Sequence, residues 1–234
     1  MHSTRWITGL IAAALLISLL FAANRALFTA VVALAAVAAL WEYIGIVGDI
    51  GTAFSGIFAK AIVSLAAVAA VVGGAYGHAP GLISAIALGL IAGGGWTVVT
   101  FGRDPQAGQK AARMLMGVVY VGLPLGLATI VWQMPQGATW LLTILAIVFV
   151  GDISAFYVGT YRGRRKLCPK VSPNKTVEGA LGGLAGSVMV GVGLKLVLFP
   201  QVSLTGMMAA GLLMGLAGQM GDLFESVLKR SADI

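Results

Sequence analysis

Carboxylates and cations recur at three places in the second half of this sequence, each beside an apolar run. The first is Asp152, which follows the apolar residues 147–150. An ionised carboxylate inside a membrane-spanning run is costly and usually faces a partner or a water-filled cavity. We therefore interpret Asp152 as a ligand for a cation or a substrate. The alternative is an aspartate that pairs with a loop lysine for structural reasons alone.

The second place is a basic loop that contains six Lys or Arg residues between positions 162 and 175. Ser172 and Pro173 are typical of a turn or a helix start, so we expect Lys175, Thr176 and Glu178 in the first turns of the next helix. A helix N-terminus favours phosphate, and Lys175 with the Thr176 hydroxyl would complete a phosphate-binding element. The alternative is a basic loop that contacts anionic lipid without specificity.

The third place is a run of polar residues near the C-terminal end. In a helix, Asp222, Glu225, Ser226 and Lys229 share one face through i+3 and i+4 spacing. Two carboxylates at a helix end suit Mg²⁺, which takes one or two carboxylates together with waters and substrate phosphates. Lys229 and the adjacent Arg230 would neutralise phosphate oxygens. The alternative is an amphipathic helix end with a Glu225–Lys229 ion pair.

These three places together predict phosphoryl or nucleotidyl transfer. Such reactions depend mostly on positioning and on neutralising charge, which is what carboxylate-bound metal and basic side chains supply. The residues fall at the ends of apolar runs, at the depth of lipid headgroups. We therefore expect the acceptor to be a lipid headgroup.

The composition identifies the elements that must position these residues. Of the 234 residues, 59% are hydrophobic and only 10% are charged, against about 25% charged in a soluble domain. This excludes a soluble globular domain, a disordered chain and a DNA-binding module, and the continuous apolar runs argue against an outer-membrane barrel. The single cysteine, Cys168, cannot form an internal disulfide. The sequence predicts an all-α, polytopic transmembrane helix bundle.

Eight apolar runs approach the roughly 20 residues needed to cross a bilayer. We expect one integral membrane domain over residues 1–234, with scaffold spans in 1–135, the site in 136–234 and a cytoplasmic loop at 159–176. Glycines spaced three or four apart in the last two runs would let helices pack closely. The predicted spans are 6–23, 26–47, 57–77, 81–101, 111–132, 138–158, 177–199 and 202–222.

Basic residues predict the orientation of these spans. With the N-terminus in the cytoplasm, 13 of the 15 Lys and Arg residues lie inside or at the inner interface, leaving only Arg25 and Lys195 outside. An even number of spans also places the C-terminus in the cytoplasm. We expect a multi-pass protein of the inner (plasma) membrane whose site faces the cytoplasm. The net charge of +7 is then a property of loops near anionic headgroups rather than a sign of nucleic-acid binding.

Three stretches, 151–157, 172–179 and 221–230, resemble in order and spacing the phosphatidate cytidylyltransferase family, also called CDP-diacylglycerol synthase. The resemblance implies the reaction of CTP with phosphatidate to give CDP-diacylglycerol and pyrophosphate. It also implies dependence on Mg²⁺, with a second cation left open. The expected partners are CTP, phosphatidate and membrane lipid, with no nucleic acid, and a homodimer is left open.

The resemblance also implies roles for particular residues. Asp222 would be a metal ligand, with Asp152 lining the same cavity and Glu225 nearby as a further ligand. Catalytic roles are expected for Asp152, Lys175, Asp222, Lys229 and Arg230. Substrate-binding roles are expected for Ser172, Pro173, Asn174, Thr176, Glu178 and Ser226.

The family's signature continues past the Ser226–Arg230 pattern with a Lys-Asp pair, a Pro-Gly-His-Gly-Gly turn and an Asp-Arg-x-x-Asp segment. This sequence stops at Ile234, so we expect the C-terminal end of the signature to be missing from it. Two other functions stay open: an ion-coupled transporter, and a catalytically incomplete membrane scaffold. The nearly pure apolar character of the outer halves of the spans favours a one-sided enzyme over a transporter. An unsaturated ether lipid in place of phosphatidate also stays open.

Overall fold

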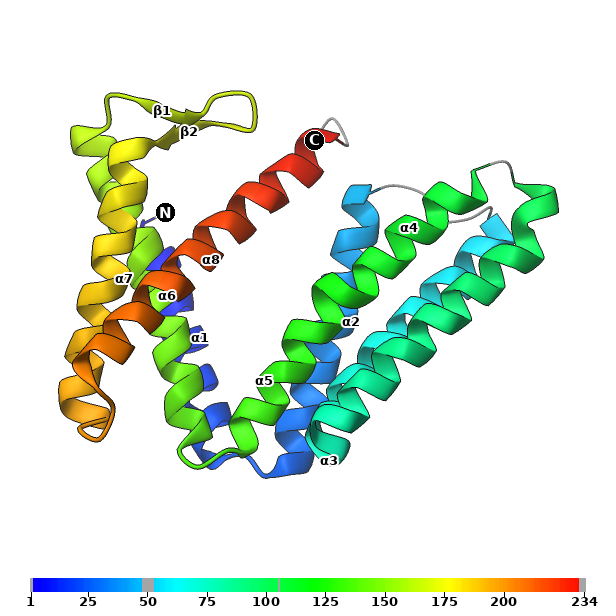
Figure 1. Cartoon of the computed structure of the whole chain (residues 1–234), viewed down its shortest axis with the longest axis horizontal. Coiled ribbons are helices and arrows are strands. Elements are labelled where there is room, and N and C mark those ends of the chain that lie inside the picture. Colours follow the sequence, from blue (N-terminus) through cyan, green and yellow to red (C-terminus); the bar gives the residue numbers. More distant parts are fainter. Residues whose placement is uncertain (1, 48–52, 105, 232–234) are drawn as a thin grey trace. The chain divides into compact units, whose positions relative to one another are not determined.

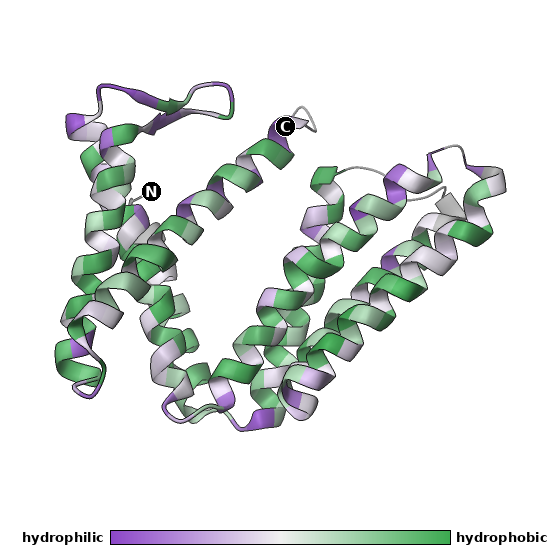
Figure 2. Ribbon diagram, viewed as in Figure 1, coloured by the Kyte–Doolittle hydropathy of each residue, from purple (hydrophilic) through white to green (hydrophobic). Residues whose placement is uncertain are grey.

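The computed structural model describes residues 2–47, 53–104 and 106–231, and the chain divides into two compact units at residue 138. Helices make up nearly all of both units (Figure 1). Among the described residues, six helices are long and apolar enough to cross a membrane, and hydrophobic residues run along them (Figure 2). This confirms the predicted class of an all-α polytopic membrane protein. The count of eight spans and the orientation of the termini stay predictions.

The first unit consists of helices whose limits follow the predicted spans closely. Its apolar run at 107–133 is continuous but passes through a π-helical turn, while the apolar part of α1 at 11–22 is shorter than a full span. The elements are α1 (His2–Ala22), α2 (Arg25–Val47), α3 (Ala53–Thr100), η1 (Phe101–Arg103), α4 (Ala107–Gly117), η2 (Val118–Gly122) and α5 (Leu123–Gln133).

Helix α3 contains two predicted spans, 57–77 and 81–101, because the chain folds back on itself at His78. His78 has φ 52° and ψ −145°, and Pro80 follows two residues later. Gly73 and Gly81 face each other across this turn so closely that a Cβ on Gly73 would lie 2.5 Å from the Gly81 carbonyl oxygen. The two halves of α3 therefore form an antiparallel helical hairpin, visible in Figure 1.

The second unit carries a small β-hairpin between its helices. Its elements are α6 (Gly137–Arg162), β1 (Lys166–Cys168), β2 (Ser172–Thr176), α7 (Val177–Leu198) and α8 (Leu204–Ser231). The strands are antiparallel, with Lys166 opposite Thr176 and Cys168 opposite Ser172. Figure 2 shows the hairpin as the most hydrophilic part of this unit.

The expected helix start at Ser172–Pro173 is wrong. Residues 172–176 form strand β2, and α7 begins only at Val177. Proline is tolerated in a strand with a free edge because its missing N–H is not needed there. Thr176 is extended, with φ −123° and ψ 154°, and its hydroxyl accepts the Gly179 N–H at 3.1 Å. This threonine is therefore the N-cap that starts α7.

Small residues hold α6, α7 and α8 together. The buried Ser187 hydroxyl of α7 donates to the Ile147 carbonyl of α6 at 3.1 Å. A Cβ on Gly211 of α8 would lie 3.0 Å from the Ser187 carbonyl oxygen. Such contacts confirm the predicted close packing through glycine. They pair α6 with α7 and α7 with α8 in antiparallel fashion, so the C-terminal half of α6, the start of α7 and residues 219–223 of α8 meet at one end of the unit. The last turns of α8 extend away from α7 (Figure 1).

Candidate active site

A cavity of about 660 Å³ opens at this end of the second unit. Its size lies within the range of small-molecule sites, roughly 300–1,000 Å³. α6, both hairpin strands, α7 and α8 all contribute to its wall. The polar and charged residues that line it include Asp152, Thr160, Asn174, Lys175, Gln219 and Asp222.

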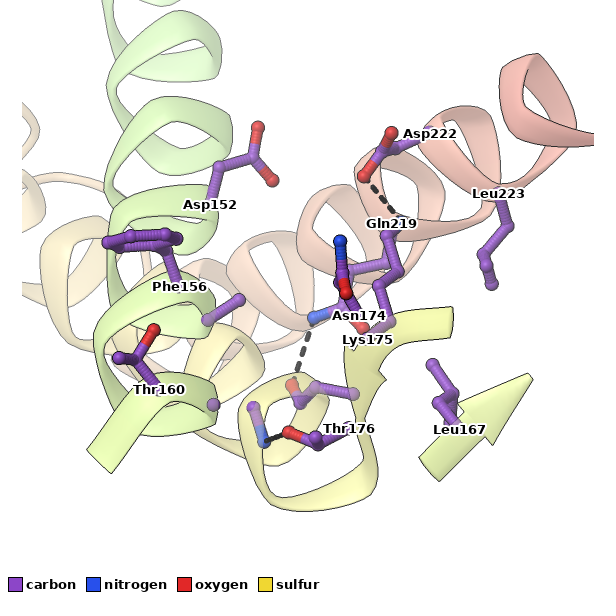
Figure 3. Close-up of a pocket in the computed structure, with 14 residues that line it drawn as sticks. Asp152, Phe156, Thr160, Leu167, Asn174, Lys175, Thr176, Gln219, Asp222 and Leu223 are labelled. Atoms are coloured by element: carbon purple, nitrogen blue, oxygen red, sulfur yellow. Dashed lines mark hydrogen bonds and ion pairs between the residues drawn. The ribbon is translucent and has the colours of Figure 1, made fainter. Parts of the chain in front are cut away.

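The structure brings Asp152, Lys175 and Asp222 into this one cavity, although they are far apart in the sequence (Figure 3). Lys175, on β2, forms an ion pair with the Oδ2 of Asp222, on α8. Asp152 approaches the same space from α6. The cavity thus combines two carboxylates with one ammonium group, which suits the binding of a divalent cation and of phosphate oxygens.

Asp152 and Asp222 form a donor set compatible with Mg²⁺. Among the described residues, no group of three or more His, Cys, Asp or Glu side chains comes together as a metal site. Mg²⁺ does not require one, since it commonly uses one or two carboxylates and completes its shell with waters and substrate phosphates. Glu225, the third predicted ligand, does not line the cavity and instead forms an ion pair with Lys229 at 2.6 Å.

Glu178 holds the hairpin in place. Its Oε2 accepts the backbone N–H groups of Arg164 at 3.0 Å and Arg165 at 3.1 Å. These bonds fasten the segment before β1 to the first turn of α7. In the structure Glu178 is therefore a positioning residue for β1 and β2, and its predicted contact with substrate stays a prediction.

The other predicted site residues divide between the cavity wall and its surroundings. Asn174 and Thr176 line the cavity beside Lys175. Ser172 and Pro173 lie earlier on β2, outside the wall. Ser226 donates its hydroxyl to the Asp222 carbonyl at 2.9 Å. Lys229 and Arg230 occupy the last turn of α8, and their predicted roles stay predictions.

Gln219 is a cavity residue that the sequence analysis missed. Its Nε2 donates to the Ala180 carbonyl of α7 at 2.9 Å. The signal available in the sequence was its position three residues before Asp222, which places both on one face of α8. A single carboxamide in a glycine-rich apolar run cannot be identified as a site residue from the sequence, because its orientation depends on a carbonyl group of another helix.

Comparison with known proteins places this site in context. A model of the cytidylyltransferase family matches residues 3–234. A phosphatidate cytidylyltransferase of Staphylococcus epidermidis is 30% identical over 172 residues, which cover 64% of this chain and 65% of that protein. The enzymes of the same name from Staphylococcus saprophyticus and Staphylococcus aureus are 34% and 36% identical over 120 residues, 51% of this chain and 45% of each relative. The chain thus spans less than two thirds of the length of these relatives.

Proposed function

Because the chain belongs to the cytidylyltransferase family, we propose that it transfers the cytidylyl group of CTP to phosphatidate. The products would be CDP-diacylglycerol and pyrophosphate. The observation that carries this proposal is the single cavity that gathers Asp152, Lys175 and Asp222 at the end of apolar helices. The names of the three relatives support phosphatidate as the acceptor.

The reaction needs charge neutralisation more than covalent help from the protein. A phosphate oxygen of phosphatidate attacks the α-phosphorus of CTP, the bond from that phosphorus to the bridging oxygen of the β-phosphate breaks, and pyrophosphate leaves with the electron pair. When the substrates bind, the Lys175 ammonium would leave its ion pair with Asp222 and bind phosphate oxygens of the substrates instead. Asp152 and Asp222 would hold Mg²⁺, which when bound supplies positive charge to the triphosphate.

The basic segment beside the cavity fits an anionic lipid acceptor. Arg164, Arg165 and Lys166 are exposed, and the Glu178 carboxylate accepts backbone amides of this segment. Cationic groups at a membrane surface attract anionic headgroups. We place the cavity at the cytoplasmic face of the inner (plasma) membrane, because this orientation keeps the basic segment inside.

The enzyme is favoured over the other two functions that the sequence left open. The relatives described above are all called phosphatidate cytidylyltransferases. The cavity gathers its charged residues at one end of the second unit, as a one-sided enzyme requires. Within the part of the chain that the structure describes, no comparable arrangement favours an ion-coupled transporter or a catalytically incomplete scaffold.

The reaction can be tested with CTP carrying radioactive phosphorus at either the α or the γ position. Membranes containing the whole protein would be incubated with Mg²⁺, phosphatidate and one of the two labelled nucleotides, and the lipid would be extracted. We expect the α label in the lipid fraction and the γ label in aqueous pyrophosphate. Replacing phosphatidate with diacylglycerol, which lacks the attacking phosphate, should abolish lipid labelling. A lipid fraction without α label, or with γ label, would contradict the proposal.

A further inference from the structure

Gln219 presents a hydrogen-bond acceptor to the cavity, and a neighbouring helix fixes that polarity. Its Nε2 lies 2.9 Å from the Ala180 carbonyl oxygen. A carbonyl oxygen only accepts hydrogen bonds, so the nitrogen of the amide must face it and the oxygen must face elsewhere. The usual ambiguity between the two ends of an amide is therefore removed by chemistry.

The oxygen of this amide is available to a ligand. Gln219 lines the cavity and is half-buried. Within the described residues, no protein donor meets its Oε1, and the one buried side-chain oxygen that lacks a partner belongs to Gln133 in the first unit. The Gln219 oxygen is therefore accessible, and it accepts hydrogen bonds but cannot donate them.

An acceptor of fixed polarity distinguishes the two pyrimidine bases of nucleotides. Cytosine carries an amino group at C4, which donates hydrogen bonds, whereas the corresponding group of uracil is a carbonyl oxygen, which accepts. We propose that Gln219 is the base-recognition residue, accepting a hydrogen bond from the cytosine amine and excluding uracil. This inference rests on the proposed use of CTP.

The surroundings of Gln219 leave room for a flat ring next to the phosphate-binding charges. Ala155 of α6 and Ala180 of α7 line the cavity with small side chains, while Gly159 and Gly179 pack against each other where the two helices meet. Asp222 lies one turn further along α8, a rise of about 4.5 Å. A base beside Gln219 would therefore leave its phosphates within reach of Asp222 and of the lysine paired with it.

The other carboxamide in the cavity lacks this selectivity. Asn174 is exposed, and no described residue holds its amide in one orientation. An amide that can turn over offers a donor or an acceptor as the ligand requires, so it binds cytosine and uracil alike. The fixed polarity of Gln219 is thus what makes it selective.

The test measures binding of radiolabelled CTP to the whole detergent-solubilised chain with Mg²⁺, in competition with unlabelled CTP or UTP. The readout is the ratio of the Kd of UTP to that of CTP. Gln219→Met removes both polar atoms at nearly constant size, whereas Gln219→Glu keeps acceptor oxygens but loses the donor to Ala180. We expect Gln219→Met to lower the ratio roughly tenfold to a hundredfold. Gln219→Glu should weaken both nucleotides while the preference for CTP persists.

Ser187→Ala is the matched control, because Ser187 also donates from one helix to a backbone carbonyl of another but does not line the cavity. It should leave the ratio unchanged. Should Gln219→Met fail to fold, Gln219→Lys keeps a donor for Ala180, and it should also lose the preference for CTP.

The possible results separate this inference from the proposed function. An unchanged ratio in Gln219→Met, or in Gln219→Lys where that variant is used, would overturn the inference. If Gln219→Met and Gln219→Glu lowered the ratio of the Kd values equally, Gln219 would serve only to join α7 and α8. That result would also overturn the inference. A wild-type chain that prefers CTP, loses that preference in Gln219→Met and labels no lipid would overturn the proposed function and uphold this inference.

Discussion

Two lysine–aspartate pairs in this chain show that an ion pair alone does not identify a site. Lys110 contacts Asp104 at 2.7 Å, and Asp104 also accepts the Gln106 N–H at 2.9 Å near the start of α4. Lys175 pairs with Asp222 on the wall of a large cavity. In the first pair, Asp104 is bound by groups of the protein itself, Lys110 and the Gln106 N–H, and the pair stabilises the start of a helix. The second faces a space in which a ligand can replace either partner.

The first pair makes a prediction about pH. The hydrogen bond from Lys110 holds the pKa of Asp104 below its ordinary value, and the bond from Gln106 lowers it further. A lowered pKa in the folded state means that the pair stabilises the fold above the ordinary aspartate pKa of about 3.9. That contribution is lost as the pH falls through the lowered value. We expect Lys110→Met to raise the Asp104 pKa in an NMR titration of its carboxyl carbon, and an unshifted titration would contradict this.

A second residue-scale prediction concerns Glu178, whose carboxylate accepts the amides of Arg164 and Arg165. Glu178→Ala leaves both amides without that acceptor, so we expect their hydrogen exchange to become several-fold faster. Mass-spectrometric exchange of the peptide covering 163–168 measures this. Glu225→Ala is the control, because it breaks only an exposed pair within one helix. Equal protection of the peptide in wild type and Glu178→Ala would show that these bonds do not hold the hairpin.

The elements of this fold differ in how far the sequence predicts them. The predicted spans 26–47 and 177–199 agree with α2 and α7 to within about two residues, because long apolar runs with polar ends leave little choice. The hairpin was missed, since Pro173 is typical of a helix start and β1 is only three residues long. Its pairing depends on Lys166 and Thr176 meeting across a turn. α8 continues past the predicted span 202–222 to Ser231, and so includes the residues from Asp222 to Lys229 that the sequence places on one helix face.

The same limit applies to the candidate site. Asp152, Lys175 and Asp222 were predicted from their type and their place beside apolar runs, and the structure brings them into one cavity. Gln219 was missed because the direction of its amide is set by Ala180 on another helix. The sequence therefore predicts which charged residues could act in a site, but it does not predict hydrogen bonds between side chains and the backbone of another helix.

Close packing of α7 against α8 yields a prediction at the scale of the element. A Cβ on Gly211 would lie 3.0 Å from the Ser187 carbonyl oxygen and 3.1 Å from the Val188 Cα, both of them backbone atoms that cannot move aside alone. We expect Gly211→Ala to destabilise the protein by about 1–3 kcal/mol, seen as a lower midpoint of thermal unfolding in detergent. Gly193, also on α7, has open space around its Cβ position. Gly193→Ala should therefore leave the midpoint unchanged or slightly higher. Equal changes of the midpoint in Gly211→Ala and Gly193→Ala would contradict the close packing of α7 against α8 at Gly211.

At the scale of the whole molecule, the candidate site lies within one of the two units. The cavity and the residues that line it belong entirely to the second unit, residues 139 onward. The described part of the first unit is built around buried small side chains, among them Ala59, Ala67, Ala70 and Ala75. Under the proposed function, the second unit would bind the substrates and the first would supply membrane-embedded structure.

The central claim is that Asp152, Lys175 and Asp222 act together on the phosphates of CTP and the lipid. Transfer of α label from CTP to phosphatidate should be measured for Asp152→Asn, Lys175→Ala and Asp222→Asn in membranes with matched amounts of protein. Asp104→Asn and Lys110→Ala, which disrupt the ion pair outside the cavity, serve as controls. We expect roughly a hundredfold loss or more from each of the first three changes and nearly full activity in both controls. Substantial transfer by the three cavity variants, or equal losses in the controls, would contradict the claim.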